Sequence, residues 1–162
     1  MISIKLKTGK SMRELLKNNH IDIRVVEKTT NILLNQIRRF NKERYPEIKL
    51  IVDPTDCSGY FFGWDEIYIT SQLDQNGWSK SKKLDTFVSH FLHELRHWIQ
   101  DNILGVSESK LNYSIQDCDD RSPSYYNNEW EVDARRFERK YKNEFITIYK
   151  TLFKLSQKQD LI

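Results

Sequence analysis

Residues 84–103, with the sequence LDTFVSHFLHELRHWIQDNI, decide the architecture that this chain can adopt. Apolar residues recur there at intervals of three and four, as they do on one face of an amphipathic helix. At about 100° per residue, His93 and His97 fall on the opposite side of that helix. The pattern predicts a helix with one face on a hydrophobic core and two histidines away from it. The apolar positions are Leu84, Phe87, Val88, Phe91, Leu92, Leu95 and Ile99.

The same stretch contains the motif HExxH, as His93-Glu94-Leu95-Arg96-His97. Two histidines four residues apart stack one helical turn apart, about 6 Å along the axis, so both imidazoles reach one tetrahedral Zn²⁺. Glu94 then lies beside the metal, where a carboxylate can act as the base that takes a proton from zinc-activated water. A solvent-exposed helix that carries these residues by chance is the alternative, and their position opposite an apolar stripe disfavours it.

A third protein ligand must come from elsewhere, because Gln100 and Ile103 stand where the longer HExxHxxGxxH pattern requires Gly and His. His90 lies near the same face, but about 10 Å of helix separates it from His97, too far for one zinc. A surface or supporting role is therefore favoured for His90. The remaining candidates are Cys118, Glu108, Asp117, Asp119, Asp120, Glu129, Glu131 and Asp133.

A second helical pattern extends from about Glu129 to Leu155. Glu131 flanks its apolar stripe near Ala134, and a small residue lets two helices approach closely, which would bring a carboxylate onto the metal. The alternative is an ordinary ion pair between Glu131 and Arg135, one turn further along the helix. The stripe consists of Trp130, Ala134, Phe137, Tyr141, Phe145, Ile148 and Leu152.

The HExxH motif combined with Glu131-Val132-Asp133-Ala134, of the form E-x-x-A, resembles the glutamate zincins, and more closely the compact ImmA/IrrE-type metallopeptidases. The resemblance covers about Tyr60 to Phe137. Residues 93–105, HELRHWIQDNILG, are also similar to the active-site helix of thermolysin-like enzymes. The Leu-Leu-x-Pro ending common after E-x-x-A in the ImmA/IrrE group is absent, and the first 59 residues match nothing specific in it.

This resemblance implies a role for each residue that matches the motifs. His93, His97 and Glu131 are implied as zinc ligands, and Glu94 is implied as the catalytic base. The thermolysin-like pattern implies that Asp101 orients a ligand imidazole. The cofactor that we expect is therefore Zn²⁺.

Two further features of the site follow from the same resemblance and from the chemistry of the reaction. The family presents an edge strand above the zinc that holds an extended substrate, and the candidates are Ile67–Ile69 or the aromatic strand before it, within residues 60–64. A donor should also stabilise the tetrahedral oxyanion, and Tyr125 or Tyr126 is the expected residue, with Tyr126 preferred. A packing role for these tyrosines is the alternative.

The rest of the chain predicts a small sheet and one supporting helix. Alternating residues predict strands at 2–6 and 48–52, and the apolar run at 60–64 with 67–69 predicts a hairpin. Spacing predicts a helix over residues 25–40, and the polar stretch 72–83 is interpreted as a surface loop. We therefore expect a single α+β zincin-like domain over residues 1–162. Its small mixed sheet is accompanied by an active-site helix and a C-terminal helix that supplies the third ligand.

Composition is compatible with a globular, cytoplasmic protein. Of 162 residues, 38% are hydrophobic and 30% charged, and no apolar run approaches the roughly 18 residues of a membrane span. Cys57 and Cys118 form no CxxC pair, so neither a disulfide framework nor a zinc ribbon is indicated. The net charge of +3 comes from interspersed residues and does not by itself indicate nucleic acid.

These features favour a metallopeptidase that hydrolyses peptide bonds of a protein or peptide substrate. One alternative is a zinc-containing regulatory or phage accessory protein that binds a partner without catalysis, although such a site has no need of Glu94. A second is a protease acting on DNA-bound proteins, with Lys80–Lys83 and Arg135–Lys142 as a basic surface.

Overall fold

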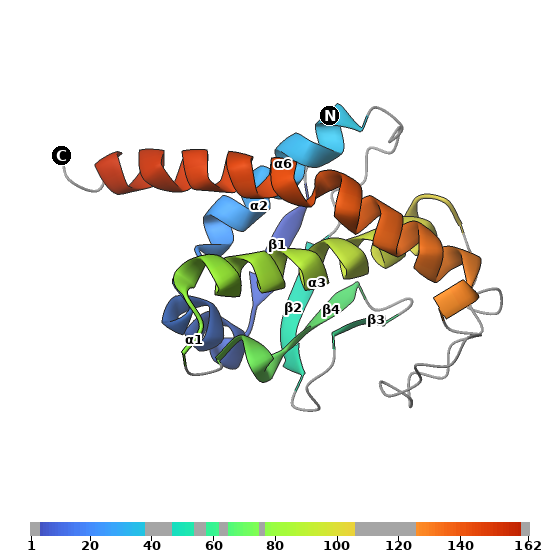
Figure 1. The fold of residues 1–162 in the computed structure, drawn as a ribbon, viewed down its shortest axis with the longest axis horizontal. Helices are drawn as coiled ribbons and strands as arrows, with labels where there is room; N and C mark the ends of the chain where they lie inside the picture. The colour runs from blue at the N-terminus through green and yellow to red at the C-terminus, as the bar shows by residue number, and fades with distance from the viewer. Residues whose placement is uncertain are drawn as a thin grey trace.

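The computed structural model describes residues 4–37, 47–53, 58–61, 65–74, 77–105 and 126–159. The chain forms a small mixed α+β fold (Figure 1). Within the described ranges, no helix combines the length and apolar character needed to cross a lipid bilayer. In chain order the elements are β1 (Lys5–Thr8), α1 (Lys10–Asn18), α2 (Ile23–Gln36), β2 (Glu47–Asp53), β3 (Gly59–Phe61), β4 (Glu66–Thr70), a 3-10 turn η1 (Ser71–Asp74), α3 (Lys80–Asn102) and α6 (Glu129–Gln159).

The four strands form one mixed sheet in the order β1-β2-β4-β3. β2 pairs in parallel with both β1 and β4, whereas β3 and β4 are antiparallel and form the predicted hairpin. Because β4 is paired on both sides, Ile67–Ile69 is wrong as an edge-strand candidate. The edge on this side of the sheet is β3, which contains the first residues of the aromatic run.

The opposite edge of the sheet, at β1, is covered by side chains of α2. The amide of Asn31 accepts a hydrogen bond from the backbone N–H of Ile4 at 2.7 Å and donates one to its carbonyl at 3.0 Å. The carboxylate of Glu27 accepts from the N–H of Leu6 at 2.7 Å. These contacts satisfy backbone groups that an edge strand would otherwise present to another chain.

One face of the sheet packs against the hydrophobic core. Ile48 and Leu50 of β2 and Ile67 and Ile69 of β4 are fully buried, and they alternate with charged or partly exposed residues on the other face. Helix α3 lies over this sheet with the apolar face that its sequence predicts, because all seven residues of that face are buried (Figure 1). The two histidines lie on the side of α3 opposite this apolar face.

Helix α6 covers the other side of α3 and runs antiparallel to it (Figure 1). Lys142 pairs with Asp85 at 2.8 Å near the beginning of α3, and Asp133 pairs with Arg96 at 2.7 Å near its end. The same helix also packs on α2, where the buried Tyr149 hydroxyl accepts a hydrogen bond from the backbone N–H of Asp22 at 2.9 Å. Helix α3 is therefore enclosed between the sheet and α6.

Asp65 links the hairpin to α3. It adopts a left-handed conformation with φ of 51°, and its carboxylate accepts a hydrogen bond from the indole N–H of buried Trp98 at 2.8 Å. Its carbonyl accepts from the N–H of Lys49 at 2.8 Å. One residue thus fixes the position of β4 against both β2 and α3.

Some predicted elements differ from the observed ones. The loop interpretation of residues 72–83 is wrong at both ends, because η1 occupies its beginning and α3 begins at Lys80. Ser79 caps that helix by accepting a hydrogen bond from the N–H of Lys82 at 3.2 Å, which explains the earlier start. Helix α1 was not predicted. Residues 1–3, 38–46 and 106–125 lie outside the described residues, and with them the candidates Glu108, Asp117–Asp120 and Tyr125, as do residues 54–57 with Cys57.

Candidate metal centre

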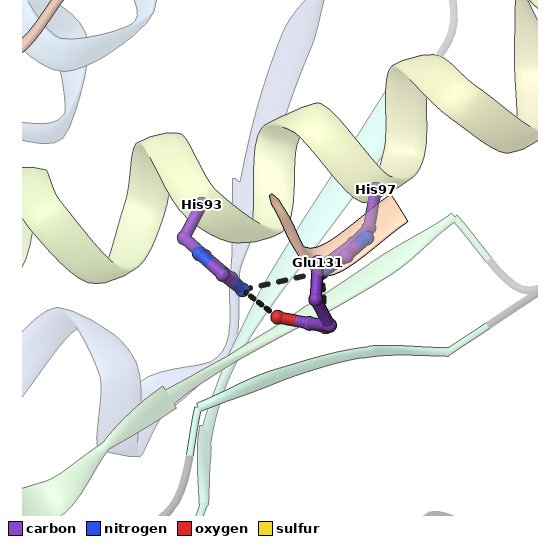
Figure 2. A group of neighbouring side chains, drawn as sticks. All are labelled: His93, His97 and Glu131. Carbon is purple, nitrogen blue, oxygen red and sulfur yellow. Dashed lines mark hydrogen bonds and ion pairs between the residues drawn. The ribbon is translucent and has the colours of Figure 1, made fainter. Parts of the chain in front are cut away.

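Three side chains from α3 and α6 converge where the two helices meet (Figure 2). The Nε2 atoms of His93 and His97 lie 3.2 Å apart. One carboxylate oxygen of Glu131 lies 3.1 Å from Nε2 of His93, and the other lies 2.9 Å from Nε2 of His97. Each residue can offer one ligand atom, and all three atoms lie within 4.8 Å of one another. The group could therefore hold a metal ion.

Local sequence explains why these side chains meet. His93 and His97 project from successive turns of α3 on the face that α6 covers. On α6, Ala134 lies one turn after Glu131, about 4.5 Å along the axis, and is completely buried. A methyl side chain at this position permits close approach of the helices, as the sequence suggested. Glu131 is only 2% exposed, although a carboxylate on a charged helix normally faces solvent.

Burial and charge act in opposite directions on Glu131. Burial alone would raise the pKa of its carboxyl group, but hydrogen bonds from His93 and His97 outweigh that effect and hold the pKa far below its usual range. The lowered pKa favours the ionised carboxylate of Glu131. An ionised carboxylate with two imidazoles is a set of groups that attracts a cation.

The pKa of Glu94 is shifted in the opposite direction from that of Glu131, although Glu94 lies between the two histidines in sequence. Glu94 is 6% exposed, and burial raises the pKa of its carboxyl group above the ordinary value, against the lowering influence of His93 and His97. A carboxyl group with a raised pKa exchanges protons closer to neutral pH than an ordinary glutamate does. The centre thus combines one carboxylate suited to binding a cation with one suited to proton transfer.

Both sequence interpretations of Glu131 describe part of the observed geometry. Arg135 lies 3.4 Å from a carboxylate oxygen of Glu131, the same oxygen that contacts His93. The ion pair along α6 therefore exists alongside the convergence with the histidines. Arg135 contacts the oxygen that faces His93 while the other oxygen contacts His97, so the ion pair does not withdraw Glu131 from the centre.

Gln100, the neighbour of Asp101 in the sequence, contacts the imidazole of His97. Nδ1 of His97 lies 2.8 Å from the side-chain oxygen of Gln100, and both residues are buried. Nδ1 of His93 lies 4.0 Å from a carboxylate oxygen of Glu138. Asp101 is half-buried on the next position of α3. Its predicted role remains a prediction, whereas Gln100 occupies the position that the role requires on His97.

Tyr126, expected as the oxyanion donor, is 48% exposed just before α6. Its ring lies beneath the guanidinium group of Arg135, 5.4 Å from the ring centroid to Cζ, and its backbone carbonyl accepts a hydrogen bond from that group. Arg135 thereby connects Tyr126 to Glu131. The catalytic role of Tyr126 remains a prediction.

Sequence analysis did not single out Gln100 and Arg96 as parts of the centre. Both belong to the α3 face that bears the histidines, and Gln100 follows His97 by three residues, a spacing at which helical side chains are neighbours. That spacing was the available signal. The contacts of both residues with α6 depend on how the helices are placed side by side.

Comparison with known proteins adds no further constraint. No family model, no curated protein and no solved structure matched this chain. The resemblance to the glutamate zincins therefore remains a prediction from two short motifs. What the centre can do chemically is inferred below from its own residues.

Proposed function

We propose that this chain is a zinc-dependent metallopeptidase of the glutamate-zincin type, with a zincin-like fold. The observation that carries the proposal is the spacing of the ligand atoms. Zinc binds imidazole nitrogen and carboxylate oxygen at about 2.0–2.2 Å, so neighbouring tetrahedral ligands lie about 3.3 Å apart. The Nε2 atoms of His93 and His97 lie 3.2 Å apart, close to that value, and each lies within 3.1 Å of one of the two oxygens of Glu131. With one ligand atom taken from each residue, all three atoms lie within 4.8 Å of one another. The residues therefore fit zinc.

The donor set also suits a catalytic site. His93, His97 and Glu131 would hold the ion, and two imidazoles with one carboxylate form a ligand set of catalytic zinc, which leaves a fourth position open. When bound, zinc supplies the Lewis acidity that polarises a carbonyl group and makes water nucleophilic near neutral pH. A purely structural site would be closed by a fourth protein ligand.

Glu94 carries out proton transfer in this proposal. Its carboxylate takes a proton from the attacking water and returns it to the leaving amine nitrogen. Burial supports this role because it raises the pKa of Glu94 toward the pH at which the group must exchange protons. Glu131 cannot serve in its place, since its two oxygens contact the histidines and Arg135.

The proposed substrate is a protein or peptide segment bound in extended form along β3. This strand ends the sheet, is paired with β4 alone within the described ranges, and packs against α3. A segment that pairs with the outer side of β3 is held through its backbone, which gives affinity with little sequence preference. Hydrolysis of unfolded proteins of varied sequence is the corresponding expectation.

The test measures metal and cleavage separately. Zinc content is determined for the wild type and for His97→Ala, Glu131→Ala and Glu129→Ala, the last being an exposed carboxylate on the same turn of α6. We expect stoichiometric zinc in the wild type and in Glu129→Ala, and its loss in the other two. Cleavage of an unfolded protein such as casein is then compared between the wild type and Glu94→Gln.

The outcomes separate the proposal from its alternative. Cleavage by the wild type that is abolished in Glu94→Gln, with zinc retained, supports catalysis by the proposed base. Zinc binding without cleavage by the wild type favours the non-catalytic regulatory protein. Absence of zinc from the wild type, even after incubation with the metal, refutes the metallopeptidase.

A further inference from the structure

A chain of hydrogen bonds lies behind His97 on the side away from the proposed ion. Gln100 is fully buried on α3, and its side-chain oxygen lies 2.8 Å from Nδ1 of His97. Its side-chain nitrogen donates to the carbonyl of Trp130 at 3.0 Å and to the carboxylate of Asp133 at 2.9 Å. One amide thus contacts a ligand histidine and two groups of α6.

The partners of Gln100 leave its amide only one orientation. The carbonyl of Trp130 and the carboxylate of Asp133 can only accept hydrogen bonds, so the amide nitrogen must face them. The amide oxygen must then face His97. An amide oxygen cannot donate, so Nδ1 of His97 carries the proton of that hydrogen bond.

This assignment fixes which ring nitrogen of His97 is available for binding. With Nδ1 protonated, Nε2 is the atom that can present a lone pair, and it is the atom directed at His93 and Glu131 (Figure 2). A hydrogen bond at Nδ1 also fixes the plane of the ring, as partners of metal-bound histidines generally do.

Asp133 extends the chain to a second contact between the helices. The same carboxylate oxygen that accepts from Gln100 also accepts from Nε of Arg96 at 2.7 Å. Arg96 precedes His97, and Asp133 follows Glu131 by two residues. The polar contact therefore joins α3 and α6 directly beside their ligands, so it can set the position of one ligand relative to the other.

We propose that Gln100, held by Asp133, is the positioning residue of His97, and that together they align the ligands of α3 with Glu131 of α6. The inference depends on the metal-binding part of the proposed function and not on catalysis. A carboxylate is the usual partner of a metal-bound histidine, besides backbone carbonyl or water. Here the neutral amide is required because Asp133 and the Trp130 carbonyl already supply the acceptors.

Four variants test the roles of the amide. Gln100→Leu keeps the approximate size and removes both hydrogen-bonding groups. Gln100→Glu keeps an acceptor for His97 but places a second carboxylate against Asp133. In the double variant Gln100→Glu/Asp133→Asn, the donor and acceptor exchange places, so the contact can reform. Gln36→Leu, at an exposed position that ends α2, is the matched control.

The measurements are zinc affinity, by competition with a chromophoric chelator, and the ¹⁵N spectrum of the histidine rings with zinc bound. We expect about 10- to 100-fold weaker zinc binding in Gln100→Leu and Gln100→Glu, and wild-type affinity in the control. The double variant should recover most of the affinity lost in Gln100→Glu. The Nδ1 proton of His97 should be observable in the wild type and lost to exchange in Gln100→Leu, a change that mere loss of packing would not cause selectively.

Failure of this inference is distinguishable from failure of the proposed function. If the wild type binds no zinc, the proposed function fails. If the wild type binds zinc and Gln100→Leu binds it within about threefold as tightly, the positioning role is overturned, because a lost histidine partner typically costs at least tenfold. Should Gln100→Leu not fold, the Glu variants decide, and a double variant no better than Gln100→Glu overturns the pairing with Asp133.

Discussion

Replacing Ala134 by leucine tests whether close approach of α3 and α6 brings the ligands together. Ala134 is the only alanine in the chain and is completely buried one turn from Glu131. Leucine adds three carbon atoms beyond Cβ. If the interface had room for them, their burial would stabilise the fold by up to about 2.4 kcal/mol, at about 0.8 kcal/mol per buried carbon.

If the interface between α3 and α6 is already filled, the substitution should destabilise the fold instead. Extra carbons in a packed core cost about 1–3 kcal/mol, because side chains leave their preferred rotamers and the backbone shifts. A shift of α6 away from α3 moves Glu131 relative to His93 and His97, so zinc affinity should fall at least about tenfold in Ala134→Leu. Ala134→Gly is the control, since it keeps the close approach and loses only about 1 kcal/mol of helix propensity.

Urea denaturation of the metal-free proteins gives the free energy of unfolding, and chelator competition gives the zinc affinity. Both variants should be less stable than the wild type, but only Ala134→Leu should bind zinc more weakly. Wild-type zinc affinity in Ala134→Leu would refute the view that helix separation sets the ligand geometry. A more stable Ala134→Leu would show that the interface contains unfilled space.

Three further predictions concern the frame around the centre. Asp65→Ala should cost about 2–4 kcal/mol in urea denaturation, because it leaves the Trp98 indole without an acceptor and forces alanine into a left-handed conformation, whereas Asp65→Asn should remain near the wild type. Asn31→Ala should cost about 1–3 kcal/mol by exposing unpaired backbone groups of β1, and a similar loss in Asn35→Ala, exposed on the same helix, would contradict this explanation. Burial raises the pKa of the Tyr149 phenol above its ordinary value of about 10. The stability from its neutral form is thus full below about pH 10 and is lost as pH rises through the folded-state pKa; Tyr149→Phe should remove this alkaline loss in thermal denaturation measured against pH.

Periodicity was sufficient to predict the elements that carry the centre. The apolar face of α3 and the long stripe of α6 follow from spacing alone, because burial of such faces is what stabilises helices in proteins. Helix α1 has buried residues at Met12, Leu15 and Leu16, with helical spacing, but its two turns are too short to stand out against the preceding strand. The start of α3 at Lys80 was not predicted because residues 80–83 are polar and have no apolar periodicity. The helix begins there because the side chain of Ser79 caps it.

Only part of the candidate metal centre could be predicted, because its residues come from two different helices. His93 and His97 are related by the geometry of one helix, so sequence is enough to bring them together. Glu131 and Asp133 lie on the same turn of α6, and which of them faces the histidines depends on the rotation of α6 about its axis. The same rotation decides that Trp130 and Asp133 of α6 receive the hydrogen bonds of Gln100. Such contacts between helices have no periodic signature in either segment.

The two edge strands of the sheet, β1 and β3, differ in how readily they can pair with a strand of another molecule. Open-ended stacking of copies through their sheets requires two free borders on each copy, so that each can receive one neighbour and offer itself to the next. At β1, the side chains of Asn31 and Glu27 occupy the N–H and carbonyl of Ile4 and the N–H of Leu6, which a neighbouring strand would need. Within the described residues, no side chain is seen to occupy the outer edge of β3 in the same way. Pairing of strands between copies is therefore favoured at the β3 border over the β1 border, which disfavours open-ended stacking.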